Sequence, residues 1–247
     1  ASFFHERKLA RRLVKKQGID LIISDNRYGL RDKSAYSIFI THQLKVIFPR
    51  AVRFFEPFFH AIQNSILRKF DEIWLPDDKE RLDLSGRLSV NQDKKITLSE
   101  IGILSRLQKV SQAEPEHSYY DVLVILSGPE PQRSLLEARL IEQLMHSGLK
   151  VCLVRGTFQA PRKAYAEMEV YSFMNTNELN RAMQQSSWII CRSGYSSVMD
   201  LIRMSKQAIL IPTPGQTEQE YLAQSLMAKE YFYSVSQHEI NLLRDLK

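Results

Sequence analysis

The sequence predicts an α/β protein made of two Rossmann-like domains, each with a parallel sheet. Two short apolar runs, Trp188–Cys191 and Ala208–Ile211, are each followed by a polar turn containing glycine and then by a helical pattern. The same alternation of strand and helix begins near residue 119. Alternation at this spacing predicts parallel strands joined by right-handed crossovers.

Charge is divided unevenly along the 247 residues, a length that fits one large domain or two ordinary ones. Residues 1–113 hold 21 Lys and Arg against 13 Asp and Glu, a net of +8, whereas residues 114–247 hold 13 against 15, a net of −2. We therefore predict one domain over 1–113 and another over 114–247, with a linker at 107–118. The basic first domain is expected to have an anionic partner.

The composition is that of a globular chain, with 44% hydrophobic and 25% charged residues. No apolar run reaches the roughly 20 residues that span a bilayer. The charged start of the chain does not resemble a signal peptide, so we expect a cytoplasmic protein. Cys152 and Cys191 lie in apolar runs and are expected to be buried, reduced thiols.

The first half predicts a basic helix followed by separated strands. The helix covers residues 5–17, and strands are expected over 19–24, 37–41 and 72–75, with a connecting region over 84–106. Polar turns follow the first two strands, at Asp25–Gly29 and at Thr41–Gln43.

Residues 44–70 stand out because six Phe alternate with five Lys and Arg. Pro57 suits the first turn of a helix that runs to about Lys69. Three interpretations are open. The segment is an amphipathic core helix with a solvated basic face, a helix that lies on an anionic membrane surface, or a stacking surface for single-stranded nucleic acid.

The second half predicts a regular series of strands and helices. Strands are expected over 121–126, 150–154, 169–173, 188–191, 208–211 and 231–235. Ser134 and Glu137 have the spacing of a capping box at the start of the first helix, and the last helix is expected over 237–246.

Three turns follow strands of the second half, at Ser127–Gln132, Arg192–Ser197 and Pro212–Glu220. The carboxyl ends of parallel strands share one edge of a sheet, where ligands bind in open α/β folds. The second turn has the parts of an anion site. Gly194 lets backbone approach a ligand, hydroxyl groups donate, and the helix start presents N–H groups and a positive dipole end.

Other polar residues near these turns suit a nucleotide sugar. Asp200 is placed to accept hydrogen bonds from a ribose diol. Gln219 and Glu220 are candidates for reading sugar hydroxyls, although Glu220 also forms a capping-box pattern with Thr217. Ser127-Gly128 permits close approach of a phosphate, but the spacing of a dinucleotide-binding motif is missing, so NAD is not expected.

The strings I-C-R-S-G-Y-S-S-V-M-D-L and I-L-I-P-T-P-G-Q-T-E-Q-E-Y-L-A resemble the donor-binding domain of GT-B glycosyltransferases. In particular they resemble the UDP-N-acetylglucosamine transferase family of peptidoglycan synthesis, with its glycosyltransferase family 28 C-terminal domain. The resemblance implies two domains whose sheets face each other across a cleft. It places Ser193 and Gly194 against the diphosphate and Asp200 against the ribose. Gln219 and Glu220 stand where the family has paired glutamines that read the sugar. The predicted donor-binding residues are Ser127, Gly128, Arg133, Arg192, Ser193, Gly194, Tyr195, Ser196, Asp200, Gln216, Thr217, Gln219 and Glu220.

The first half resembles the later part of the family's acceptor domain. The matching segments are residues 20–29, 41–43 and 101–106. The family's Gly-rich loop with its catalytic His has no counterpart here, so the N-terminal domain is expected to be incomplete and the main base to lie outside this sequence. His42 is the one catalytic candidate within it. The predicted acceptor-side residues are Asp25, Asn26, Arg27, Tyr28, Gly29, Gln43 and Arg106.

The resemblance implies a glycosyltransferase that moves N-acetylglucosamine or a related hexose from a UDP-sugar to an acceptor hydroxyl. A lipid-linked sugar is one candidate acceptor, and no metal or other cofactor is expected. The expected partners are the UDP-sugar and an anionic membrane surface, without nucleic acid, so the protein is expected to be peripheral on the inner membrane face. A UDP-sugar epimerase of the same fold and a non-catalytic subunit that binds a UDP-sugar or a membrane partner are the alternatives.

Overall fold

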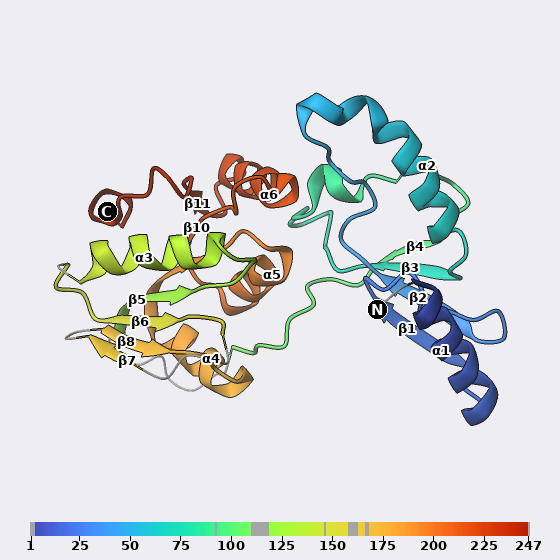
Figure 1. The fold of residues 1–247 in the computed structure, drawn as a ribbon, viewed down its shortest axis with the longest axis horizontal. Coiled ribbons are helices and arrows are strands. Elements are labelled where there is room, and N and C mark those ends of the chain that lie inside the picture. The colour runs from blue at the N-terminus through green and yellow to red at the C-terminus, as the bar shows by residue number, and fades with distance from the viewer. Residues whose placement is uncertain are drawn as a thin grey trace. The chain divides into compact units, whose positions relative to one another are not determined.

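The computed structural model describes residues 3–91, 93–109, 119–145, 147–157, 163–165 and 168–246. The chain divides into two compact units, Ala1–Leu104 and Ser105–Lys247 (Figure 1). The predicted boundary at residue 113 falls inside the second unit. Leu107 is buried there, and the backbone N–H of Gln108 donates to the Asn180 side chain at 3.1 Å. The first part of the predicted linker is therefore packed, and its residues 110–118 lie outside the described residues.

The first unit contains a parallel sheet in the order β1-β2-β3-β4. The strands are β1 (Leu21–Asp25), β2 (Tyr36–Ile40), β3 (Glu72–Leu75) and β4 (Leu98–Glu100). The helices are α1 (Phe3–Gln17), η1 (Arg50–Phe55), α2 (Glu56–Leu67) and η2 (Gly86–Ser89). The core on one side of this sheet is formed by Phe39, Leu44, Leu67, Phe70, Ile73 and Ile96.

Helix α1 is attached to the turn after β1. The Arg27 guanidinium donates to the Glu6 carboxylate at 2.7 and 2.9 Å, and this partner lowers the pKa of Glu6. Gly29 sits directly under the helix, and a Cβ on it would lie 2.6 Å from the Phe3 carbonyl oxygen and 2.7 Å from Glu6 Cβ. The turn and helix therefore fit together only because position 29 has no side chain.

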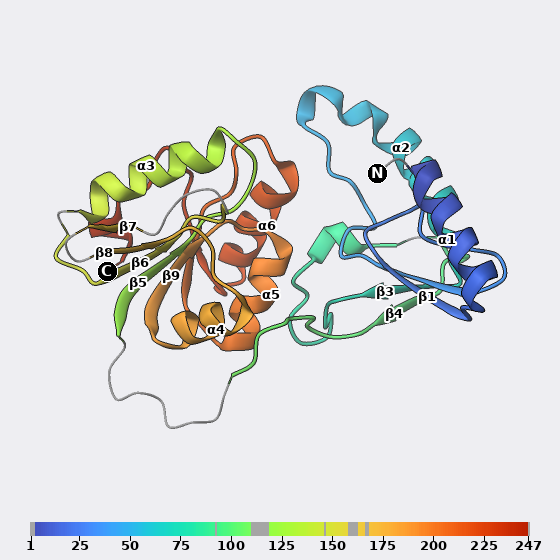
Figure 2. The same ribbon diagram turned by 60° about the horizontal axis from the view of Figure 1, so that its bottom comes forward.

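The second unit contains a sheet in the order β11-β10-β9-β5-β6-β8-β7. Its strands are β5 (Tyr120–Ile125), β6 (Val151–Val154), β7 (Lys163–Tyr165), β8 (Met168–Tyr171), β9 (Ser186–Cys191), β10 (Ala208–Leu210) and β11 (Tyr233–Ser234). Its helices are α3 (Gln132–Leu144), α4 (Thr176–Gln184), α5 (Tyr195–Met204), α6 (Thr217–Ala228) and α7 (Leu242–Asp245). Helices cover both faces of the sheet (Figures 1 and 2). The strands from β11 to β8 are parallel, as predicted, and their centre is buried by Val122, Val124, Leu153 and Ile190.

Several local predictions were wrong. Strand β7 was not predicted, and it pairs antiparallel with β8. The capping box predicted at Ser134 does not form, because α3 already begins at Gln132 and Glu137 binds Arg133 and Arg155 instead. A complete capping box forms at α4, where Asn175 accepts from the N–H groups of residues 177 and 178 and Glu178 accepts from the Asn175 N–H. The last helix is also shorter than predicted.

The two cysteines are buried and free, as predicted. Burial raises the pKa of the Cys191 thiol to about 12, so it stays protonated at neutral pH. None of the helices that the structure describes has both the length and the hydropathy to cross a bilayer.

Gly29→Ala is expected to destabilise the attachment of α1 by roughly 1–3 kcal/mol, because the new methyl group collides with the helix backbone. Hydrogen exchange of residues 3–17 measures the effect, and those amides are expected to exchange faster. Gly194→Ala is the matched control, since the nearest atom to its Cβ is 4.0 Å away and its φ of −72° suits alanine. Unchanged exchange in α1 of Gly29→Ala would contradict the contact.

Candidate functional site

The three predicted turns of the second unit lie together at the carboxyl edge of its sheet, and the Arg192 side chain joins them. Its guanidinium donates to the Gln132 carbonyl oxygen at 2.9 Å, at the start of α3. It also donates to the carbonyl oxygens of Ile211 and Pro212 at 3.3 and 3.2 Å, after β10. A fourth bond, of 2.7 Å, reaches Gln237 Oε1 after β11. One side chain thus connects the loops after β5, β9, β10 and β11.

Arg192 was predicted to contact the donor, and its placement contradicts that role. The residue is 1% exposed, and its hydrogen-bonding partners are groups of the protein. Burial lowers the pKa of the guanidinium to about 10, which still leaves it charged at neutral pH. Arg192 therefore shapes the edge and is not available to a ligand.

The start of α5 is open. Gly194 is the N-cap, and no side chain among the described residues caps this helix. A Cβ on Gly194 would meet only Ser197 Oγ, at 4.0 Å, so the space beside the helix start is empty. Ser196 is exposed one position into the helix, while Tyr195 is buried. The helix start therefore presents backbone N–H groups next to an exposed hydroxyl, which are the groups on which the prediction of an anion site rests.

The role of Ser193 differs from the predicted one. Its side chain is fully buried, and its hydroxyl donates to the Gln219 carbonyl oxygen in the first turn of α6 at 2.8 Å. The hydroxyl is therefore not presented to a diphosphate. It holds the starts of α5 and α6 together.

Asp200 lies half-buried on α5 and accepts a 2.5 Å hydrogen bond from the Ser105 hydroxyl. Burial raises the pKa of the Asp200 carboxyl, against lowering effects of the Ser105 hydrogen bond and of the nearby Arg106 charge. Arg106 was predicted on the acceptor side, but it belongs to the second unit and interacts with Asp200. Sequence reasoning missed this pairing, because 94 positions separate the two residues in the chain.

The loop between β10 and α6 is held by the residues predicted to read the sugar. Gln219 Oε1 accepts from the Thr213 N–H at 2.9 Å, and Gln219 Nε2 donates to Gln216 Oε1 at 2.6 Å. Glu220 Oε1 accepts from the Gly215 N–H at 2.9 Å. The expected capping box of Thr217 and Glu220 does not form, because Gln216 is the N-cap and Thr217 is already helical. Both side chains thus have a structural role in this loop.

The turn after β5 leaves Ser127 and Gly128 exposed. Gly128 has a φ of 101°, a conformation that side chains disfavour. Arg133, predicted to contact the donor, instead binds Glu130, Glu137 and the Arg155 carbonyl oxygen. Thr213, which sequence reasoning missed, lies under this turn. Its buried Oγ1 has no hydrogen-bonding partner in the described structure and lies 3.6 Å from the position of a Cβ on Gly128.

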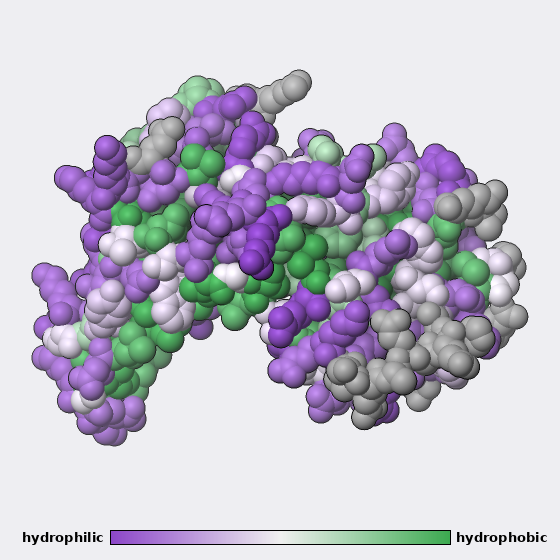
Figure 3. All heavy atoms as spheres, turned by 180° about the vertical axis from the view of Figure 1, so that it is seen from behind, coloured by the Kyte–Doolittle hydropathy of each residue, from purple (hydrophilic) through white to green (hydrophobic). Residues whose placement is uncertain are grey.

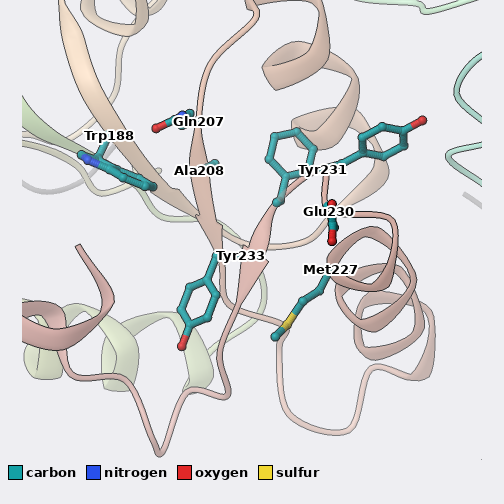
Figure 4. A pocket seen from close by; sticks show the side chains of 8 residues that line it. Trp188, Gln207, Ala208, Met227, Glu230, Tyr231 and Tyr233 are labelled. Atoms are coloured by element: carbon teal, nitrogen blue, oxygen red, sulfur yellow. The ribbon is translucent and has the colours of Figure 1, made fainter. Parts of the chain in front are cut away.

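Described residues of this unit line cavities at both ends of the sheet. The first, of about 400 Å³, lies at the carboxyl edge beside α6. It is lined by Pro212, Pro214, Glu220, Ala223, Gln224, Met227 and residues 234–238. The second, of about 320 Å³, lies at the amino ends of β10 and β11, where Trp188, Gln207 and Tyr233 line it (Figure 4). None of the predicted site residues lines the second cavity, so the first is the one that belongs to the candidate site.

The acceptor-side residues of the first unit lie around the carboxyl ends of β1 and β2. Asp25 and Asn26 are exposed, and Asn26 has a φ of 50°. Gln63 Nε2 of α2 donates both to Tyr28 Oη at 3.3 Å and to the Gln43 carbonyl oxygen at 3.1 Å.

Three of the predicted acceptor-side residues make structural contacts within the first unit. Arg27 and Gly29 contact α1, and Tyr28 packs on Phe39. His42 is half-buried after β2. No group of three or more His, Cys, Asp or Glu side chains within the described ranges is arranged to hold a metal ion.

Comparisons with known proteins agree with this architecture. Residues 132–246 match the family described as the glycosyltransferase family 28 C-terminal domain. No curated protein matches the chain by sequence. Among solved structures, the glycotransferase of kitacinnamycin has 12% sequence identity and a TM-score of 0.61, over 98% of this chain and 70% of that chain.

Two further structures have the same fold. MurG of Acinetobacter baumannii has 14% identity and a TM-score of 0.57, over 97% of this chain and 66% of its own. Arabidopsis thaliana UGT89C1, solved with UDP-L-rhamnose, has 11% identity and a TM-score of 0.61, over 96% of this chain and 63% of its own. The chain therefore spans about two thirds of the length of these structures.

The predicted resemblance is confirmed: the fold is that of the GT-B glycosyltransferases, and residues 132–246 match the glycosyltransferase family 28 C-terminal domain.

Proposed function

We propose that this protein takes part in the transfer of a sugar from a UDP-sugar to an acceptor hydroxyl. The observation that carries the proposal is the open start of α5, where Gly194 leaves free space beside uncapped backbone N–H groups at the carboxyl edge of the sheet. Backbone N–H groups and a helix dipole at such a place bind a diphosphate and stabilise the charge that develops on it as the sugar leaves.

Other groups around α5 are suited to bind the remaining parts of the nucleotide sugar. Asp200 offers a carboxylate to a ribose diol, and Arg106 adds a positive charge beside it. The exposed Ser196 and the Ser127-Gly128 turn supply further polar contacts. The first-choice donor sugar is N-acetylglucosamine or a related hexose, which the family resemblance suggests.

On the acceptor side, the proposal gives His42 the role of a general base. A lipid-linked acceptor would place the protein on the cytoplasmic face of a membrane. The proposed chemistry uses no metal, because the helix start takes over the stabilisation of the diphosphate.

Nucleotide binding is tested by thermal unfolding with UDP, UDP-N-acetylglucosamine, dTDP and GDP. UDP compounds are expected to raise the unfolding temperature, since a ligand held at 100 times its dissociation constant stabilises the folded state by about 2.7 kcal/mol. Stabilisation by no uridine nucleotide would contradict the proposal. Stabilisation by dTDP or GDP alone would exclude a UDP-sugar as the donor. Release of UDP from UDP-N-acetylglucosamine in the presence of an acceptor then tests transfer.

Gly194→Ala is expected to keep the unfolding temperature of the ligand-free protein and to weaken UDP binding about ten-fold or more, about 1.4 kcal/mol. The added methyl group occupies the space next to the N–H groups, and its nearest neighbour, Ser197 Oγ, is 4.0 Å away. Asn175→Ala, at the N-cap of α4, is the matched control: it removes a real cap and costs about 1 kcal/mol of stability without changing UDP binding. If Gly194→Ala binds UDP with unaltered affinity, the start of α5 is not the diphosphate-binding site.

The variant Asp200→Asn distinguishes an effect of this carboxylate on stability from an effect on UDP affinity. Because burial raises the pKa of Asp200 in the folded protein, ionisation costs stability. This cost is absent below the unfolded-state pKa and complete above the folded-state pKa. At neutral pH the variant is therefore expected to unfold at the same or a higher temperature, while its UDP affinity falls. A variant that loses stability and keeps its UDP affinity would assign Asp200 a purely structural role.

A further inference from the structure

The cavity at the amino ends of β10 and β11 is a second concave surface of this unit, and half of the residues that line it are aromatic. Its volume of about 320 Å³ is enough for a small ligand. Trp188 belongs to β9 and Tyr233 to β11, whereas Met227 lies in the last turn of α6 and Glu230 follows that helix. In Figure 4 the Trp188 ring borders the cavity on one side, and Met227 and Glu230 border it on another (Figure 4).

Two of the aromatic rings are accessible from solvent. Tyr233 is 39% exposed, and Trp188 is half-buried because part of it packs on the core of the sheet. The Tyr233 hydroxyl donates to the Asp245 carboxylate at 3.3 Å, which fixes the far end of this side chain. The faces of indole and phenol rings carry partial negative charge and attract a cation that lies within about 6 Å of the ring centre.

The cavity also has a carboxylate that is not neutralised. Glu230 is exposed, and its carboxylate has no hydrogen-bonding or ion-pairing partner among the residues that the structure describes. The C-terminal end of α6 lies beside it and adds partial negative charge. Lys206 and Lys229 adjoin lining residues in the chain, but neither lines the cavity. Lys206 donates to the carbonyl oxygens of Gln184 and Ser186 at 2.9 and 3.0 Å. The ring faces, the carboxylate and the helix end therefore all favour a positively charged ligand.

The backbone at Glu230 indicates that its side chain is not needed for folding. Two hydrogen bonds of 3.0 Å close the end of α6, from the Glu230 N–H to the Met227 carbonyl oxygen and from the Tyr231 N–H to that of Leu226. This arrangement gives Glu230 a φ of 59°, a conformation that glycine adopts more readily than any other residue. Such backbone strain is found preferentially at functional positions. A glutamate at a position suited to glycine therefore points to a role in binding.

We propose that this cavity binds an alkylated ammonium group, with its charge against the faces of Trp188 and Tyr233 and beside the Glu230 carboxylate. A primary ammonium has three N–H donors that need acceptors, but most of the lining consists of aromatic rings and the Met227 thioether. An ammonium whose hydrogens are replaced by methyl groups needs no acceptor and keeps its charge, which is why aromatic sites recognise it. The proposal does not depend on the activity proposed above.

The surface around the second unit fits a small ligand better than a broad apolar partner. On the side seen in Figure 3, apolar areas of this unit are interrupted by hydrophilic residues (Figure 3). Broad partners with apolar surfaces bind contiguous apolar patches. A single cationic group in a cavity needs only the few side chains that surround it.

The fluorescence of Trp188 tests the proposal without any nucleotide. The protein contains two tryptophans, and the other one, Trp74, lies on β3 of the first unit. In a Trp74→Phe background the signal therefore comes from the cavity alone. Choline is the probe, and its neutral analogue, in which a carbon atom replaces the nitrogen, is the reference. At constant ionic strength, choline is expected to change the fluorescence at a concentration about ten-fold lower or more than the analogue. Tetramethylammonium is expected to bind more tightly than butylammonium, which has N–H donors.

Variants of the lining separate charge recognition from apolar contact. Glu230→Gln and Tyr233→Leu are each expected to weaken choline binding about three-fold or more, because each removes a group that attracts the cation. Binding of the neutral analogue and of UDP is expected to be unchanged. The matched control is Glu142→Gln, which removes the same charge from the exposed side of α3 and is expected to leave choline binding unaltered.

Glu230→Gly distinguishes a ligand-binding role from a structural one. This variant is expected to unfold at the same or a higher temperature, because glycine suits the backbone conformation there, and to bind choline as weakly as Glu230→Gln. A variant that unfolds at a lower temperature and keeps its choline affinity would make Glu230 a structural residue and overturn its assigned role.

Equal affinity for choline and its neutral analogue would overturn the proposal, as would the absence of a fluorescence response to every cation. Equal choline affinity of the wild type and the Glu230→Gln/Tyr233→Leu double variant would also contradict it. Tighter binding of N-acetylglucosamine than of choline would assign the cavity to a carbohydrate instead. None of these outcomes affects the test of UDP binding, which reports on the opposite edge of the sheet.

Discussion

The candidate site depends on one buried guanidinium. Parallel strands end in loops whose carbonyl oxygens point into the same region, and buried carbonyl groups need donors. Arg192 supplies several donors in a rigid planar fork and reaches the loops after β5, β10 and β11 from its own loop after β9. Its bonds go to carbonyl and carboxamide oxygens, while its Nε has no hydrogen-bonding partner in the described part of the chain. The charge is therefore compensated by dipoles of the very loops that it positions.

This network explains why so few of the polar side chains at the edge face outward. Ser193 binds a carbonyl oxygen in the first turn of α6, and Gln219 and Glu220 bind backbone N–H groups of the loop before α6. Arg133 in the same way braces the turn after β5. The groups that remain exposed at this edge are backbone groups and the side chains of Ser127 and Ser196. A site fixed in this way loses little conformational entropy when a ligand binds, which is the advantage of preorganisation.

The sequence was sufficient to predict the strands around Trp188–Ile211 and the turn at Gly194, because periodicity and glycine placement are local signals. It could not predict the roles of side chains whose partners are distant in the chain. Arg192 bonds to residues 60 and 45 positions away, and Asp200 bonds to Ser105 across 95 positions. The predictions of capping boxes were wrong for a related reason. The patterns at Ser134 and Thr217 are valid locally, but both helices begin earlier, and Glu137 and Glu220 bind other groups instead.

Residues 44–70 also show that local sequence signals do not reveal which distant groups a side chain binds. Their composition left a core helix, a membrane surface and a stacking surface for nucleic acid open, since each of these uses aromatic and basic residues. The direction of each face is decided by a few hydrogen bonds, in which Glu56, His60 and Gln63 bind inward. Once those three polar groups are satisfied inside, helical periodicity forces the intervening Phe side chains outward. The exposed aromatic surface is therefore a consequence of how the inner side of α2 is bound. The spacing of apolar residues along the segment does not contain that information, because the same spacing is compatible with either direction of the apolar face.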